Sequence, residues 1–94
     1  MNIPEKTGNL LDKYLKKYGL YREFKRRQVI IDWNKITEGK FFHLTPLFFE
    51  KDVLICKVDD LSYLSELNNK KGELREKINN YLKEYKIEDI RIIK

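Results

Sequence analysis

The sequence predicts a single α+β domain, on three observations. Apolar residues recur at helical spacing over residues 8–18 and 20–37, and aromatic and β-branched residues then dominate residues 41–58. A further helical stripe over 61–85 leads into a short strand pattern at 87–93. With 94 residues, of which 41% are hydrophobic, the chain is long enough for one core and too short for a second. We therefore expect residues 1–94 to form one domain, with an N-terminal helix in residues 1–19 and the core in residues 20–94.

Two helices are predicted before the strands. The first runs from Gly8 to Tyr18 and ends at Gly19, because glycine is common just past a helix end. The second runs from Leu20 to Thr37 and ends at Gly39, and its apolar residues form two stripes on nearly opposite sides. One stripe is Leu20, Phe24 and Ile31, and the other is Val29, Trp33 and Ile36. We expect the second helix to be covered on two sides, for instance by the first helix and by a sheet.

A β-hairpin follows, and the sheet is completed at the C-terminus. Residues 41–49 and 53–58 are rich in aromatic and β-branched residues and are separated by a polar turn, Glu50-Lys51-Asp52. Pro46 has no N–H to donate, which puts it on an edge strand or at a bulge. Residues 87–93 form the last strand pattern. These segments predict a three-stranded sheet packed by helices.

The segment between the hairpin and the last strand is helical. Asp59 or Asp60 can cap it, and the apolar residues of residues 61–85 recur at helical spacing. The polar stretch from Asn68 to Gly72 interrupts this stripe, so either one long helix carries an exposed polar turn there or two helices meet at it. The predicted order is helix, helix, strand, strand, helix or helix pair, strand.

The positive charge is concentrated in the first part of the chain. The net charge is +5, and residues 1–40 contain ten Lys or Arg against five Asp or Glu, whereas residues 41–94 contain ten of each. Such an asymmetry favours an anionic partner such as nucleic acid, and a solvated, lysine-rich surface is the alternative explanation. The densest group is Arg22, Lys25, Arg26 and Arg27, four cations within six residues of one predicted helix.

The residues that usually carry catalysis are few. With one histidine and one cysteine, His43 and Cys56, the chain offers neither a multi-ligand zinc site nor a Ser-His-Asp arrangement. Cys56 falls within a predicted strand and is interpreted as a small packing residue. Phosphate-binding loops of the GxGxxG or GxxxxGK[ST] type do not occur in the sequence. We therefore expect no enzyme activity, no cofactor and no metal.

The N-terminus resembles no signal peptide and no apolar run suits a membrane span, so we expect a cytoplasmic protein.

Residues 30–46 form a junction between the second helix and the first strand. This stretch holds the one tryptophan, the one histidine and one of two prolines. Trp33 has helical spacing with Val29 and Ile36 and is interpreted as a core anchor. Gly39 allows the backbone to turn sharply into the strand. His43 is given a structural role on an irregular edge strand, so the stretch is interpreted as a structural junction and not as a catalytic site.

The ordered apolar positions resemble a known family. The order is Val29, Trp33, Ile36, Gly39, residues 43–46 (HLTP), residues 53–58 (VLICKV), Tyr63, Leu67, Leu74, Ile78-Asn79, Leu82 and residues 90–92 (IRI). This pattern resembles the DciA-like family of bacterial proteins from about Leu20 to the end of the chain. The resemblance implies a domain similar to the type II KH fold, with residues 69–72 in the place of the KH loop. It also implies binding to DNA and contact with the replicative DnaB-type helicase.

We therefore expect a nucleic-acid-binding accessory protein that resembles the globular domain of a helicase loader. Its partners would be DNA or RNA, bound without sequence specificity through phosphate contacts, and a replicative helicase, with no role for a membrane. The alternative is a protein-interaction adaptor whose basic helices dock on an acidic partner and do not bind nucleic acid. The expected nucleic-acid-binding residues are Lys16, Lys17, Arg22, Lys25, Arg26, Arg27, Lys70 and Lys71.

Overall fold

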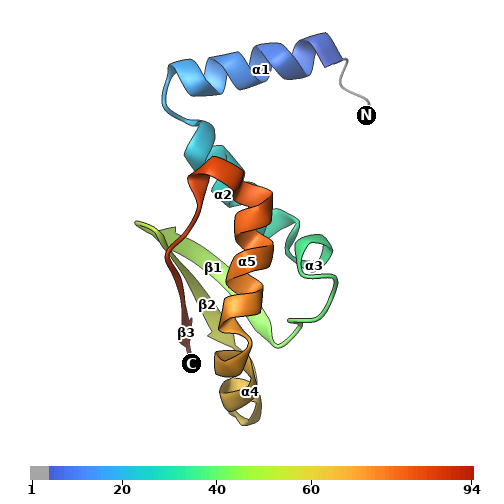
Figure 1. Ribbon diagram of the computed structural model, residues 1–94, viewed down its shortest axis with the longest axis vertical. Helices are drawn as coiled ribbons and strands as arrows, with labels where there is room; N and C mark the ends of the chain where they lie inside the picture. The colour runs from blue at the N-terminus through green and yellow to red at the C-terminus, as the bar shows by residue number, and fades with distance from the viewer. Residues whose placement is uncertain (1–4) are drawn as a thin grey trace.

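Residues 5–94 are described by the structure, a computed structural model, with side chains described from Leu10 onward. The first four residues of the expected 1–94 domain lie outside the described part. The elements are α1 (Glu5–Lys17), α2 (Tyr21–Ile31), α3 (Trp33–Ile36), β1 (Leu44–Glu50), β2 (Val53–Val58), α4 (Leu64–Asn69), α5 (Lys71–Leu82) and β3 (Asp89–Ile93), with short 3₁₀ turns at Leu61–Tyr63 and Lys83–Tyr85. This is the α+β class and the element order that the sequence predicts (Figure 1).

The three strands form one sheet in the order β1-β2-β3. β1 pairs with β2 as an antiparallel hairpin, and β3 returns parallel to β2 after the α4–α5 crossover. The register of β1 shifts between Pro46 and Phe48, so Pro46 lies at a bulge on an edge strand, as its missing N–H predicts. The strand begins at Leu44, three residues later than expected, because residues 37–43 form turns after α3.

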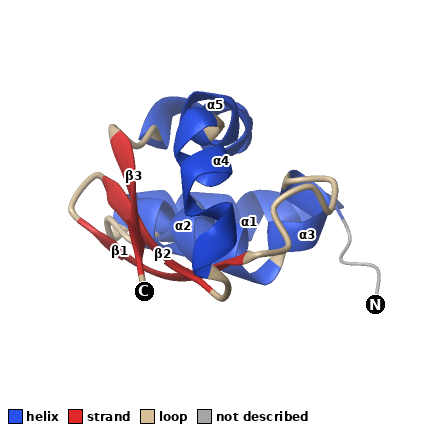
Figure 2. Cartoon of the chain, turned by 90° about the horizontal axis from the view of Figure 1, so that it is seen from below, coloured by secondary structure: helices blue, strands red, loops and turns tan. Residues whose placement is uncertain are grey.

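The core lies between one face of the sheet and the helices α2, α3, α4 and α5. Viewed from below, the strands lie at the left of the molecule, with α5 and α4 beside them at the top and centre and α3 at the right (Figure 2). Side chains alternate along β2, so that Leu54, Cys56 and Val58 are buried on the inner face. The helices contribute Val29, Trp33, Leu67, Leu74, Ile78 and Leu82 to the same cluster. Trp33 is thus a core anchor and Cys56 a small packing residue, as the sequence predicts.

The helix expected over residues 20–37 is divided in two. α2 ends at Ile31, Asp32 has φ −97° and ψ 22°, and α3 begins at Trp33 as a single turn. Thr37 is fully buried and its hydroxyl donates to the carbonyl of Trp33 at 2.7 Å. Gly39 has φ +71° and turns the chain toward β1, which agrees with the interpretation of residues 30–46 as a junction.

The expectation that the first helix covers the stripe of Leu20, Phe24 and Ile31 holds only at the beginning of α2. Only Leu15 of the α1 stripe is buried, and Ile31 on α2 is 64% exposed. Figure 1 shows the reason, because α1 extends away from the rest of the molecule and meets only the beginning of α2. The exposed apolar side chains of α1 are Leu10, Leu11 and Tyr14, and Tyr18 just after the helix is exposed as well. Helical periodicity therefore predicted this helix correctly but not what its apolar face contacts.

The polar stretch from Asn68 to Gly72 separates two helices. α4 ends at Asn69, α5 begins at Lys71, and Lys70 lies between them with its backbone N–H near the carbonyls of Glu66 and Leu67. Asp60 caps the preceding 3₁₀ turn by accepting from the N–H of Ser62 at 3.0 Å. Of the two arrangements left open by the sequence, the structure therefore has the helix pair.

Candidate nucleic-acid interface

The eight cationic residues expected to bind nucleic acid lie in two separate places. Lys16 and Lys17 end α1, and Arg22, Lys25, Arg26 and Arg27 lie on α2, so these six share one end of the molecule. Lys70 and Lys71 lie at the α4–α5 junction, at the other end (Figure 1). The structure therefore brings six of the expected residues into one region and separates the other two from it.

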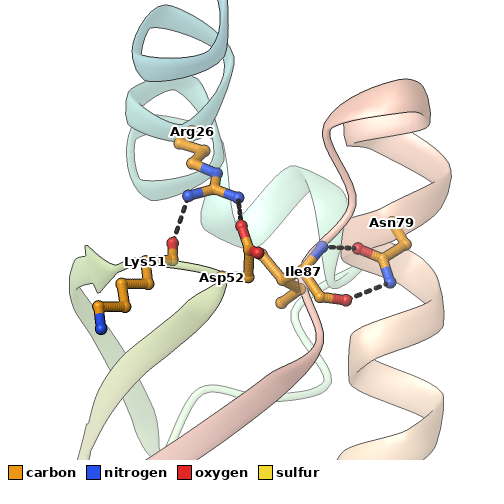
Figure 3. A network of polar contacts seen from close by, with 5 residues as sticks. All are labelled: Arg26, Lys51, Asp52, Asn79 and Ile87. Atoms are coloured by element: carbon orange, nitrogen blue, oxygen red, sulfur yellow. Dashed lines mark hydrogen bonds and ion pairs between the residues drawn. The ribbon is translucent and has the colours of Figure 1, made fainter.

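Arg26 does not belong to the free cationic surface, which corrects the expectation from the sequence. The residue is 9% exposed. Its guanidinium donates to the backbone carbonyl of Lys51 and, at 2.8 Å, to the carboxylate of Asp52 (Figure 3). It also lies over the ring of Phe49, with 5.3 Å to the ring centroid. Arg26 therefore holds the β1–β2 turn against α2.

The turn held by Arg26 has an uncommon backbone. Glu50 pairs with Val53, so Lys51 and Asp52 form a two-residue hairpin loop. Lys51 has φ +54°, a conformation that favours glycine and costs a residue with a Cβ about 1 kcal/mol or more. The hydrogen bond from Arg26 to the Lys51 carbonyl and the ion pair to Asp52 stabilise this conformation. The Lys51 side chain points away from Arg26 (Figure 3) and is exposed.

The other cations of α2 face different neighbours. Lys25 is half-buried with its ammonium 4.3 Å from the centroid of the Tyr81 ring, on the side of α2 that packs on α5. Lys16 lies 5.2 Å from the centroid of Tyr21 at the α1–α2 junction. Arg22 and Arg27 are exposed and line a common groove. These two arginines are therefore the α2 cations best placed to meet a ligand.

The groove between α2 and β1 has a volume of about 500 Å³. Four of its lining residues are cationic and one is acidic, and the remainder are apolar. The residues are Arg22, Glu23, Arg26, Arg27, Ile30, Leu47, Phe48, Phe49 and Lys51. Sequence reasoning did not include Lys51, Leu47 or Phe48 in the site. The sequence did contain a signal for an exposed aromatic residue. Two successive phenylalanines in a strand face opposite sides of the sheet, and the helices cover only one of these sides.

The α4–α5 junction is polar and exposed, as the sequence predicts. The Lys70 ammonium lies 3.1 Å from the Glu66 carboxylate one helical turn earlier. Lys71 is half-buried and Gly72 is exposed. The position corresponds to the KH loop of the resemblance, but its charge is partly neutralised and Gly72 is its one glycine.

His43 and Cys56 have structural surroundings. The His43 ring stacks on Tyr63 with centroids 3.6 Å apart, and its Nδ1 lies 3.1 Å from the Asp59 carboxylate. Burial raises the pKa of the Cys56 thiol to about 12, so the thiol stays protonated at neutral pH.

Among residues 5–94, no three His, Cys, Asp or Glu side chains are grouped so as to hold a metal ion. Within the same residues, no helix combines the length and the apolar character needed to cross a membrane.

Comparison with known proteins assigns the family. The sequence matches the family described as Dna[CI] antecedent, DciA, over residues 6–92, which is nearly the whole chain. None of the curated proteins matches the chain. The family is associated with helicase loading in DNA replication and is linked to the replicative helicase as a partner. The match over residues 6–92 shows that this chain belongs to the DciA family.

Proposed function

We propose that this protein is a non-enzymatic accessory protein of helicase loading that binds nucleic acid in the groove between α2 and β1. The observation that carries the proposal is the charge of the groove, which has three exposed cationic residues, Arg22, Arg27 and Lys51, against the acidic Glu23, while Arg26 is already paired with Asp52. Lys and Arg contacts to phosphates supply most of the affinity in non-specific binding. The exposed guanidiniums of Arg22 and Arg27 can each donate two hydrogen bonds to phosphate oxygens from a regular helix.

The cations around the groove extend the proposed contact area. Lys16 and Lys17 are exposed at the end of α1, next to the beginning of α2, whereas the Lys25 ammonium lies over Tyr81 on the α5 side of α2. A phosphate chain that follows the groove would meet Lys16 and Lys17 where it leaves the Arg22 end. Because the proposed contacts are to phosphates, we expect affinity without sequence preference.

The element order also supports a comparison with type II KH domains, the fold that the family resemblance implies. In KH domains a GxxG loop clamps the nucleic-acid backbone. The corresponding residues here are Asn69, Lys70, Lys71 and Gly72, with one glycine and an ion pair from Lys70 to Glu66. We therefore place the main interface in the groove, with the α4–α5 junction as a second, separately testable contact.

Removing charge from the groove tests the proposal. The variant Arg22→Gln/Arg27→Gln removes two exposed cations, and Lys35→Gln/Lys40→Gln is the control because it removes two exposed cations on or just after α3, outside the groove. Binding to fluorescent single-stranded, duplex and forked DNA is measured by anisotropy at several salt concentrations. We expect the groove variant to bind several-fold more weakly, with a slope of log K against log salt that is shallower by up to about 2. Equal affinity and an equal slope for wild type and both variants would refute the groove as the binding site.

A second candidate function is a protein-interaction adaptor that does not bind nucleic acid. The exposed apolar side chains of α1 favour it, because Leu10 and Tyr14 lie on one helix face away from the core. The test is capture of the host's replicative helicase by wild type, by Arg22→Gln/Arg27→Gln and by Leu10→Ser/Tyr14→Ser. Loss of capture in the α1 variant, together with no DNA binding by wild type at low salt, would support the adaptor.

A further inference from the structure

The outer face of the sheet, opposite the helices, carries both aromatic and cationic side chains. Strand alternation places Leu54, Cys56 and Ile90 on the inner face, in the core cluster. The same alternation places Thr45, Phe48, Lys57, Arg91 and Ile93 on the outer face, where all five are exposed. The three strands lie at one side of the molecule in Figure 2, which leaves this face open to a ligand.

One row of residues across the three strands combines an exposed aromatic ring with a cation. Phe48 on β1 pairs with Ile55 on β2, and Ile55 pairs with Arg91 on β3. The Phe48 side chain is 50% exposed, although burial of a side chain as large and apolar as phenylalanine would stabilise the fold. Ile55 between them is only 4% exposed, so the flanking side chains cover it. The row is therefore a supported platform with a free aromatic ring at the β1 edge and an arginine at the β3 edge.

The bulge in β1 connects this outer face to the groove. The register shifts between Pro46 and Phe48, so Leu47 is the additional residue on the edge strand. Leu47 and Phe48 both line the groove, and Phe48 also belongs to the outer face by its pairing with Ile55. A ligand held by Arg22 and Arg27 in the groove can therefore reach Phe48 by crossing the β1 edge, without passing through the core.

The charges of the outer face differ from those of the groove. Arg91 lies on the same row as Phe48, and Lys57 lies on the row toward the beginning of β1, whereas the acidic residues of this face, Glu50 and Asp89, lie together on the row beside the hairpin turn. The face is thus neutral as a whole, and the excess of positive charge lies in the groove. This division suits a ligand with a charged backbone on one side and flat, uncharged groups on the other.

We propose that the groove and the outer face together bind single-stranded DNA, with one base stacked on the ring of Phe48. The proposal rests on the proposed function and names its substrate. Proteins that bind single strands combine a cationic groove for the backbone with aromatic side chains for the bases. In a duplex the base faces are already stacked on one another, so Phe48 gives no advantage to duplex binding. Phe48 therefore discriminates between the two forms of DNA, and Arg22 and Arg27 do not.

Substitution of Phe48 tests the inference separately from the phosphate contacts. Phe48→Ala removes the ring, Phe48→Trp keeps an aromatic ring, and Phe42→Ala is the matched control because Phe42 is also exposed but lies before β1, outside the groove. Binding to an oligo-dT of about 15 nucleotides, within the range of known single-strand sites, and to a duplex of the same length is measured by anisotropy. We expect Phe48→Ala to weaken single-strand binding about five- to tenfold, with duplex binding and the salt slope unchanged. Phe48→Trp and Phe42→Ala are expected to bind like wild type.

A spectroscopic measurement detects the stacking directly. Trp33 is buried in wild type, so the additional emission of Phe48→Trp reports on the outer face alone. We expect oligo-dT to quench this emission, and the duplex to leave it unchanged at equal occupancy. An unaltered single-strand affinity in Phe48→Ala at wild-type stability, or equal losses for single strand and duplex, would overturn the inference. If Arg22→Gln/Arg27→Gln still weakens binding in that case, the proposed function stands without the stacking contact. If neither substitution changes binding, both proposals are wrong.

Discussion

The guanidinium of Arg26 lies 2.8 Å from the carboxylate of Asp52, a residue 26 positions later in the chain. The Arg26 side chain is 10% exposed and that of Asp52 is 46% exposed. Arg26 belongs to α2 and Asp52 to the turn between β1 and β2, so the ion pair joins the helix wall of the groove to the strand wall. The shape of the candidate interface therefore depends on a cation that is itself engaged within the protein.

Replacing either member of this pair should destabilise the fold. Exposed ion pairs contribute about 0–1 kcal/mol, and loss of one partner from a fully buried pair costs about 3–5 kcal/mol. Because this pair is partly buried, we expect Arg26→Gln to lower the free energy of unfolding by about 2–3 kcal/mol and Asp52→Asn by about 1–2 kcal/mol. Urea denaturation of both single variants and the double variant measures the coupling. An Arg26→Gln protein with wild-type stability and weakened DNA binding would instead make Arg26 a ligand contact.

Trp33 and His43 should differ strongly in their contribution to stability. Trp33 is 6% exposed within the core cluster, so Trp33→Ala should cost about 3–5 kcal/mol. His43 stacks on Tyr63 at the surface end of β1, and its partner Asp59 is exposed, so His43→Ala should cost about 1 kcal/mol or less and leave DNA binding unchanged. Thermal or urea unfolding compares the two. A stably folded Trp33→Ala protein that has specifically lost DNA binding would contradict the interpretation of residues 30–46 as a junction.

The α4–α5 junction should contribute less to DNA binding than the groove. Lys70 is paired with Glu66 and Lys71 is half-buried, so fewer free donors are present there than at Arg22 and Arg27. We expect Lys70→Gln/Lys71→Gln to change affinity for single-stranded and duplex DNA by less than about twofold, measured beside the groove variant. A loss as large as that of the groove variant would show that the interface includes the position of the KH loop.

Cys56 should be unreactive in the folded protein. Burial raises the pKa of its thiol to about 12, so the reactive thiolate is nearly absent at pH values near 8. We expect a disulfide reagent such as DTNB to modify the native protein slowly, at the rate at which unfolding exposes Cys56. In concentrated urea, modification should be rapid. Rapid modification of the native protein would show that the inner face of β2 is accessible.

The elements of this fold could be predicted because each has a local signal. Helical spacing around Leu74 and Ile78, β-branched residues in 53–58 and glycine at position 39 are properties of neighbouring residues, and they predicted the order and the class. The pairing of Arg26 with Asp52 has no such signal. Four cations within six residues of α2 look equivalent in the sequence, and only the position of the hairpin turn distinguishes Arg26 from Arg22 and Arg27.

The face that a helix buries was likewise not predictable from periodicity. The stripe of α1 has the spacing of a buried face, yet Leu10 and Tyr14 are exposed because α1 leaves the core at Gly19. Spacing identifies which residues share a side, whereas burial depends on the path of the chain after the turn. The groove itself was missed for the same reason, since Phe48 and Arg27 become neighbours only when β1 lies beside α2.

Asn79 makes a pair of hydrogen bonds that should be sensitive to a change of one atom. Its Nδ2 donates to the Ile87 carbonyl at 3.1 Å, and its Oδ1 accepts from the Ile87 N–H at 2.8 Å (Figure 3). These bonds satisfy both backbone groups of a buried residue just before β3, at the point where the chain leaves α5 and enters the sheet. Asn79→Asp keeps the acceptor and loses the donor, so a carboxylate oxygen would face the Ile87 carbonyl.

We therefore expect Asn79→Asp to lower the free energy of unfolding by about 1–3 kcal/mol at neutral pH. The neighbouring Asn80→Asp is the matched control, because Asn80 is exposed, and it should cost about 0.5 kcal/mol or less. Only the protonated form of the introduced carboxyl group could donate to the Ile87 carbonyl, so the pKa of that group should be higher in the folded state than in the unfolded state. The deficit of Asn79→Asp should then shrink as the pH falls toward the pKa range of free aspartate, whereas Asn79→Ala should show no such recovery. Urea denaturation of the three variants across this pH range measures the effect, and a deficit in Asn79→Asp that does not change with pH would argue against the paired hydrogen bonds.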